Sequence, residues 1–208
     1  TTATILNQIL KTAKSSAYIG TNGISYLDKT IKMKLTTPTP DIFYEAYGVF
    51  KKHNINDLVM EVSSEGILDG RIERLEFDGA IFTNLSHEHL NTHRTMEQYF
   101  KTKTKLFENL KKKALAVINS DDFYATEAIA HTKAKVVTYG INSGTYQAKN
   151  IQLDVLSSSF DVFYKGMFLA RFTLPLFGKY NIYNALAAIA YAHELGIDMK
   201  YIKEAISS

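Results

Sequence analysis

The chain has 208 residues, a formal net charge of +3 and a hydrophobic content of 46%, which fits one large or two small globular domains. It contains no cysteine, and this excludes disulfides, a thiolate zinc site and a cysteine nucleophile. No apolar run is long enough to span a bilayer, no signal-peptide pattern is present, and the lysines are dispersed among acidic residues; we therefore expect a cytoplasmic protein that binds neither membrane nor nucleic acid.

The first predicted element is an amphipathic helix over residues 1–14, followed by a short strand over residues 17–20. The strand leads into the hexapeptide GTNGIS at residues 20–25. A phosphate loop would need a lysine in this hexapeptide and a helix after it, but Ile24 stands at the lysine position. We therefore interpret the hexapeptide as a turn between strands.

A loop and a helix follow at residues 36–53. The prolines in Thr36-Thr37-Pro38-Thr39-Pro40 indicate a loop, and Asp41 is the predicted N-cap of a helix over residues 42–53. Hydroxyl groups ahead of a helix N-terminus can bind an anion, whereas plain turn and capping chemistry accounts for the same residues. Both interpretations stay open at this stage.

Two short apolar runs each end in polar residues. Residues 58–60 lead into Glu61, Ser63 and Ser64, and residues 80–82 lead into a polar segment at residues 83–89. Such runs suit strands of a parallel sheet, and ligands bind outside the carboxyl ends of these strands. We predict that the two strand ends are adjacent and form a site.

The helix after these strands places Lys103 on its inward stripe. The stripe, with spacings of three and four residues, consists of Met96, Phe100, Lys103, Phe107 and Leu110. Burial disfavours an ammonium and lowers its pKa, and a neutral amine near a metal is a nucleophile or the precursor of a carbamate. The alternative is a lysine whose stem packs while its charged head returns to water.

The remaining elements complete an α/β pattern. Predicted in chain order are a short helix or loop (65–74), a strand (114–119), a helix (123–131), a strand (135–139), an antiparallel ribbon (146–177), and helices at 182–195 and 201–208. The chain is therefore predicted to be an α/β domain with a mostly parallel central sheet flanked by helices and an antiparallel β appendage.

A metal site is also predicted near the two strand ends. Glu61, His89 and a neutral or modified Lys103 could surround a hard cation such as Mg²⁺, which prefers oxygen ligands. The alternative is zinc held by His87, His89 and His93, although no zinc-enzyme motif with a correctly spaced base is present.

Four segments occur together in this order: MEVSSEGILDGRI, FDGAIFTNLSHEHLNTHRTMEQYFKTKTKLF, VINSDD and FGKYNIYNALAAIA. Through them the chain resembles the central, ATP-binding domain of the Mur ligases, most closely the UDP-N-acetylmuramoyl-tripeptide synthetases, over essentially all 208 residues. The resemblance implies a P-loop-like mononucleotide-binding fold. It also implies a ligase of peptidoglycan synthesis that uses ATP to join an amino acid to UDP-N-acetylmuramoyl dipeptide through an acyl phosphate.

The resemblance further implies roles for individual residues. Glu61 and His89 match ligands of the Mg²⁺ near the γ-phosphate of ATP, with His89 and a carbamoylated Lys103 as the catalytic pair. Positions that hold the UDP-muramoyl substrate in the family are matched by Thr36, Thr37, Ser63 and Arg71. Positions that contact ATP or its metal are matched by Thr1 and Asn181.

The chain departs from the family pattern at Glu65, Asp69 and Asn91, where histidine, glutamine and aspartate are usual. These departures leave open a Mur-like ligase for a folate or polyglutamate acceptor, and a non-catalytic nucleotide-binding module. We expect residues 1–208 to be a monomeric fragment without turnover of its own. The family's phosphate loop, GTNGKT, would lie just before Thr1, and the domains that bind the UDP end and select the amino acid would lie outside the chain.

Overall fold

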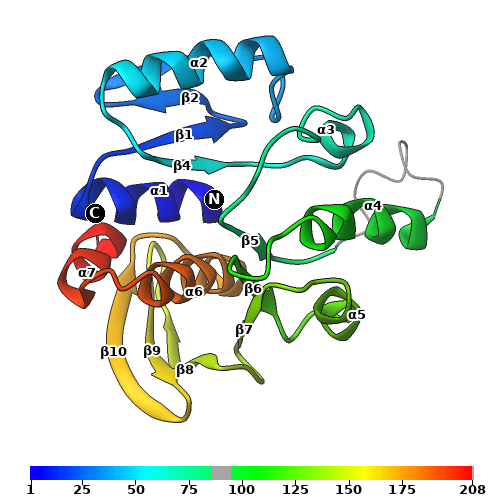
Figure 1. Cartoon of the computed structure of the whole chain (residues 1–208). Coiled ribbons are helices and arrows are strands. Elements are labelled where there is room, and N and C mark those ends of the chain that lie inside the picture. Colours follow the sequence, from blue (N-terminus) through cyan, green and yellow to red (C-terminus); the bar gives the residue numbers. More distant parts are fainter. Residues whose placement is uncertain (86–94, 208) are drawn as a thin grey trace.

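The computed structural model describes residues 1–85 and 95–207, whose strands form two sheets (Figure 1). Sheet A has the order β3-β2-β1-β4 and contains β1 (Ser16–Gly20), β2 (Gly23–Tyr26), β3 (Lys29–Ile31) and β4 (Asp57–Met60). β1 pairs antiparallel with β2 through the predicted turn and parallel with β4. The GTNGIS segment is therefore a hairpin turn between β1 and β2, as predicted.

Sheet B has the order β10-β9-β8-β7-β6-β5. Its strands are β5 (Gly79–Phe82), β6 (Leu115–Asn119), β7 (Lys135–Gly140), β8 (Tyr146–Leu153), β9 (Ser158–Tyr164) and β10 (Met167–Leu174). β5 to β8 pair in parallel, whereas β8, β9 and β10 form an antiparallel meander. The predicted α/β class, with parallel strands and an antiparallel appendage, is confirmed.

The helices lie close to their predicted positions. They are α1 (Thr2–Ala13), α2 (Pro40–Lys52), α3 (Ser64–Leu68), α4 (Met96–Glu108), α5 (Ala125–Ala130), α6 (Lys179–Glu194) and α7 (Met199–Ser207). The predicted N-cap of α2 was wrong: Thr39 is the N-cap, and Asp41 lies in the first turn. The reason is Pro40, whose fixed φ and missing N–H suit the first helical position.

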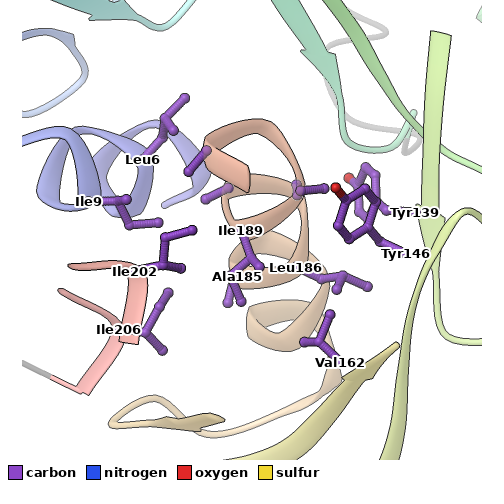
Figure 2. Close-up of a cluster of buried hydrophobic side chains, with 14 of the residues drawn as sticks. Leu6, Ile9, Tyr139, Tyr146, Val162, Ala185, Leu186, Ile189, Ile202 and Ile206 are labelled. Carbon is purple, nitrogen blue, oxygen red and sulfur yellow. The ribbon is translucent and has the colours of Figure 1, made fainter. Parts of the chain in front are cut away.

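The largest hydrophobic core joins the two sheets. Figure 2 shows Leu6 and Ile9 of α1 close to Ile202 of α7 and Ile189 of α6, and all four side chains are buried. Val59 of β4 belongs to the same cluster as the core residues of sheet B. α1 therefore packs on sheet A and against α6 and α7, which in turn pack on sheet B, and so it links the two sheets. No helix in the described residues is both long and apolar enough to cross a membrane.

One prediction about the sheet needs correction. The sequence predicted one mostly parallel central sheet with the ends of these two strands adjacent, but β4 is an edge strand of sheet A and β5 is an edge strand of sheet B. Hydrophobic patterning identifies each strand as buried, but it does not say which strands pair.

Candidate functional site

A cavity of about 990 Å³, which we call the β4–β5 cavity, separates the two edge strands. Backbone and side chains of residues 56–62 line one side and residues 78–85 line the other, so the cavity follows both strands along their whole length. At the carboxyl ends of the strands its lining is polar and includes Glu61, Thr83, Asn84, Lys103 and Thr1. Both predicted strand ends therefore contribute to one site, although a gap lies between them.

Glu61 is held by hydrogen bonds from the β1–β2 hairpin. One carboxylate oxygen accepts from the Tyr18 hydroxyl at 2.9 Å. The other accepts from the Thr21 amide at 2.9 Å and from its hydroxyl at 2.7 Å. Burial alone would raise the pKa of Glu61, but the hydrogen bonds from Thr21 and Tyr18 outweigh it and lower the pKa below its usual value. Glu61 is therefore an ionised, positioned carboxylate.

Thr21 is a site residue that sequence reasoning missed. The Thr21 hydroxyl lies 3.1 Å from the Thr36 hydroxyl. Thr21 therefore links Glu61 to the loop at residues 36–40, which we call the substrate loop because Thr36 and Thr37 are predicted to bind the substrate. The sequence correctly predicted GTNGIS as a turn between strands, but it did not predict that Thr21 in this turn binds Glu61. The parallel pairing of β1 with β4 brings the residue after β1 beside the residue after β4.

Thr37 connects three of the predicted substrate-binding residues. Its hydroxyl accepts from the Ser63 amide at 2.8 Å and donates to the Glu61 carbonyl at 3.1 Å. Arg71 donates to the Thr37 carbonyl at 2.9 Å and forms an ion pair with Asp69. The Ser63 hydroxyl accepts from the Gly66 amide and thereby caps α3. Thr37, Ser63 and Arg71 therefore lie together at the carboxyl end of β4.

Lys103 faces the protein, as the stripe predicted. Phe100, Phe107 and Leu110 on the same face are buried, whereas Lys101 and Lys105 on other faces are exposed. The Lys103 ammonium donates to the Val62 carbonyl at 3.3 Å. Burial lowers the pKa of Lys103, and the negative charge of Glu65 opposes this shift without cancelling it.

The two predicted ATP-contacting residues differ in placement. Thr1 lines the β4–β5 cavity beside Thr2, whose hydroxyl donates to Asn184 at 2.8 Å. Asn181 instead donates to the Phe177 carbonyl at 2.9 Å within its own helix start. It lines neither the β4–β5 cavity nor a second cavity of about 230 Å³ beyond the carboxyl ends of β5 and β6, where Asn184 contributes. Asn184 lies about one helical turn after Asn181 and lines both cavities, but sequence analysis did not identify it as a site residue.

The predicted metal ligands fall partly outside the described residues. His89, the alternative zinc ligands His87 and His93, and Asn91 all belong to residues 86–94. In the described part of the chain no group of three or more histidine or acidic side chains is placed to hold a metal. The oxygen donors of Glu61 and Thr1 at the cavity mouth do fit a hard cation in their chemistry.

The fold and site define a class: an α/β domain with a ligand cavity at the ends of parallel strands, where a carboxylate, hydroxyls and a partly buried lysine meet. Comparison with known proteins makes the family plain. The model of the Mur ligase middle domain matches residues 1–192, and the chain belongs to this family.

Two curated relatives carry the name UDP-N-acetylmuramoyl-L-alanyl-D-glutamate–2,6-diaminopimelate ligase. The one from Chlamydia pneumoniae is 37% identical over 93% of this chain and 40% of its own length. The one from Caldanaerobacter subterraneus is 39% identical over 86% of this chain and 37% of its own length. A solved structure of a ligase with that name superposes with a TM-score of 0.88 at 25% identity, over 99% of this chain and 43% of that chain. The chain thus spans about two fifths of the length of these proteins.

Proposed function

We propose that the full-length protein is an ATP-dependent ligase of peptidoglycan synthesis that joins an amino acid to UDP-N-acetylmuramoyl dipeptide. The observation that carries the proposal is the hydrogen-bonded cluster of Thr36, Thr37, Ser63 and Arg71 directly beside Glu61. These side chains come from separate loops, and sequence resemblance alone had assigned them to one substrate. The names of the similar proteins support the same acceptor and make diaminopimelate the first amino acid to test.

In this proposal the substrate loop binds the anionic muramoyl substrate. Arg71 is oriented by the Thr37 carbonyl and by Asp69, so its guanidinium is fixed before the substrate arrives. A planar, permanently charged guanidinium suits carboxylate and phosphate groups. The hydroxyls of Thr36 and Ser63 supply neutral hydrogen bonds next to it. Fixing these groups in advance reduces the entropic cost of positioning the reacting carboxylate.

Glu61, Thr1 and His89 are the proposed contacts to ATP and its Mg²⁺. The lowered pKa keeps Glu61 ionised near neutral pH, as a magnesium ligand requires. Magnesium, when bound, neutralises charge on the transferring phosphoryl group. Asn181 is kept as a proposed ATP contact, and its amide would have to leave the Phe177 carbonyl to reach the base.

Lys103 is the proposed site of carbamoylation. The neutral amine attacks carbon dioxide, an N–C bond forms and one proton is released, which gives an anionic carbamate. Burial favours the reacting neutral amine, because it destabilises the ammonium and lowers the pKa of Lys103. Glu65 acts in the opposite direction, since its negative charge favours the ammonium.

The test is ADP release by the full-length protein with UDP-N-acetylmuramoyl dipeptide and a panel of amino acids. We expect release that depends on the muramoyl substrate and falls at least about 100-fold in Lys103→Ala, without rescue by excess bicarbonate. The matched control is Lys101→Ala, because Lys101 lies on the exposed face of the same helix and its loss should leave the rate unchanged. Turnover with a folate or polyglutamate acceptor only would identify a different ligase of this fold.

Absence of turnover with every acceptor would instead favour a nucleotide-binding module. We expect the active protein to be a monomer, and to act in the cytoplasm because both proposed nucleotide co-substrates are soluble. The isolated 208-residue chain is expected to be inactive, and muramoyl-dependent ADP formation by it would contradict that expectation.

A further inference from the structure

The turn between β1 and β2 is built closely around the Glu61 carboxylate. Gly20 pairs with Gly23 across the ladder, so Thr21 and Asn22 form a two-residue hairpin turn. A Cβ added at Gly20 would lie 2.7 Å from the carboxyl carbon of Glu61, so this close approach requires a residue without a side chain. Gly23 has a φ of +101°, which favours glycine and fixes the far end of the turn. The backbone therefore determines where Thr21 lies relative to the carboxylate.

The Thr21 hydroxyl has a single proton, and its two contacts determine where that proton points. Its oxygen lies 2.7 Å from a carboxylate oxygen of Glu61 and 3.1 Å from the hydroxyl oxygen of Thr36. A carboxylate accepts hydrogen bonds and has none to donate. Thr21 therefore donates its proton to Glu61. In its contact with Thr36 the Thr21 oxygen can then only accept.

The direction of this contact determines what Thr36 offers to a bound molecule. The Thr36 hydroxyl donates its one proton to Thr21, so only its oxygen lone pairs remain for a ligand. The result is a directed chain of hydrogen bonds from Thr36 through Thr21 to Glu61, which ends on a negative charge. A charge-assisted bond is stronger than a neutral one, and successive bonds in a chain polarise one another. Both effects hold the Thr36 proton toward Thr21.

The neighbouring groups of Ser63 and Arg71 have the opposite polarity. The Ser63 hydroxyl accepts from the Gly66 amide at 3.0 Å and shares the proton of the Thr37 hydroxyl, which lies 3.3 Å away. Its own proton is therefore what remains for a ligand. The Arg71 guanidinium contains only donors, and the Thr37 carbonyl orients it from a distance of 2.9 Å. One acceptor and two kinds of donor thus lie close together at the end of β4.

We propose that Thr21 is a positioning residue that makes Thr36 a hydrogen-bond acceptor for the substrate. The bound molecule places an N–H or O–H group on Thr36 and its anionic oxygens on Ser63 and Arg71. An anionic oxygen at Thr36 would meet lone pairs instead of a proton and would be repelled. The inference rests on the proposed function for the identity of this molecule. In UDP-N-acetylmuramoyl dipeptide the donor is an amide N–H or a hydroxyl of the sugar, and the anion is a carboxylate or phosphate.

The first test locates the protons without any ligand. Neutron diffraction from crystals of the deuterated full-length protein reveals the deuterium on each ordered hydroxyl. We expect the Thr36 deuterium on the line to the Thr21 oxygen, and the Thr21 deuterium on the line to Glu61. A Thr36 deuterium directed away from Thr21 would overturn the proposal, whatever molecule the protein binds.

The second test measures the Kd of UDP-N-acetylmuramoyl dipeptide by calorimetric titration of the full-length protein, without ATP or Mg²⁺. Thr21→Val keeps the shape and the backbone contact to Glu61 but removes the hydroxyl. It should weaken binding about fivefold to tenfold, the equivalent of about one hydrogen bond, whereas Thr21→Ser should stay within about twofold of the parent. The matched control is Thr30→Val, because the Thr30 hydroxyl also lies 3.1 Å from another hydroxyl, that of Ser25, but away from Glu61. Its Kd should be unchanged.

A double variant separates a positioning role from a structural one. Thr21→Val combined with Thr36→Val should bind no more weakly than Thr36→Val alone, because Thr21 acts on the substrate only through Thr36. Losses that multiply in the double variant would overturn the proposal. The Tm of each variant, measured in parallel, shows whether the domain remains folded. If Thr21→Val does not fold, the proton positions and the Thr36→Val arm below decide the question.

Two substrate analogues identify the donor group that Thr36 accepts. In one the amide N–H groups are methylated, and in the other the free ring hydroxyls of the sugar are replaced by hydrogen. One of them should bind the parent protein about fivefold to tenfold more weakly than the natural substrate, and should lose no further affinity in Thr36→Val. Full affinity of both analogues would overturn the proposal. If the parent binds no muramoyl dipeptide, the proposed function fails, and the proton positions still test the chain from Thr36 to Glu61.

Discussion

The structure predicts that the Thr37 hydroxyl, rather than its bulk, holds the substrate loop on the end of β4. Thr37 is fully buried, and its hydroxyl accepts from the Ser63 amide and donates to the Glu61 carbonyl. Thr37→Val keeps nearly the same shape but removes both hydrogen bonds. Each net bond contributes about 1 kcal/mol, and the part-buried Ser63 N–H left without an acceptor adds a penalty, for a total of about 2–4 kcal/mol.

The matched control is Thr37→Ser, which keeps the hydroxyl and removes one buried methyl group. That loss costs only about 1 kcal/mol. For a domain of this size each kcal/mol corresponds to about 2–4 °C in Tm, so a loss of about 3 kcal/mol lowers the transition of the valine variant by roughly 6–12 °C. The serine variant should fall by roughly 2–4 °C.

The assay is differential scanning calorimetry of the full-length protein, with the middle-domain transition followed in both variants. The KM for the proposed muramoyl substrate should rise in Thr37→Val, because loss of the two hydrogen bonds would shift the Thr37 carbonyl, which orients Arg71. Equal stability of the valine and serine variants would refute the reasoning, since it would mean that the two hydrogen bonds contribute nothing beyond packing.

Two further predictions concern the neighbouring helix and the second cavity. Gly66→Ala should destabilise the domain by about 1–3 kcal/mol, measured by the same calorimetry, because the added Cβ would lie 2.6 Å from the Cβ of Thr37; an unchanged Tm would show that α3 shifts freely. For Asp121, burial would raise the pKa, but hydrogen bonds from backbone amides and from the Tyr183 hydroxyl lower it. Its stabilising effect is therefore present above the unfolded pKa of about 4 and is lost as pH falls through the lower folded value. Asp121→Asn should show a flatter fall of Tm at acid pH than the parent protein, and parallel curves would contradict this assignment.

Local patterns predicted most elements of the fold. The amphipathic pattern of residues 1–14 identified α1, and the ribbon predicted over residues 146–177 contains the antiparallel strands β8, β9 and β10. The start of α2 was displaced by two residues because Pro40 and Asp41 both favour a first helical turn, and only the backbone geometry distinguishes the cap from the residues after it.

The candidate site was predictable where a residue type and its spacing both carry meaning. Lys103 stood out because a cation on an apolar stripe conflicts with its surroundings, and the structure confirms that it faces the protein. Thr21 could not be identified in this way. A threonine in a turn is ordinary, and its role depends on the pairing of β1 with β4, which connects residues 40 positions apart.

The sequence located the ends of β4 and β5 at one site, but it did not predict that the two strands belong to different sheets. Apolar runs followed by polar residues correctly located two strand ends at one site, because parallel strands of an α/β fold share an edge for ligands. Two strands can share that edge as immediate neighbours or with one strand between them, and the sequence pattern is identical in both cases. In this structure β4 and β5 are edge strands of different sheets, and the β4–β5 cavity lies between them.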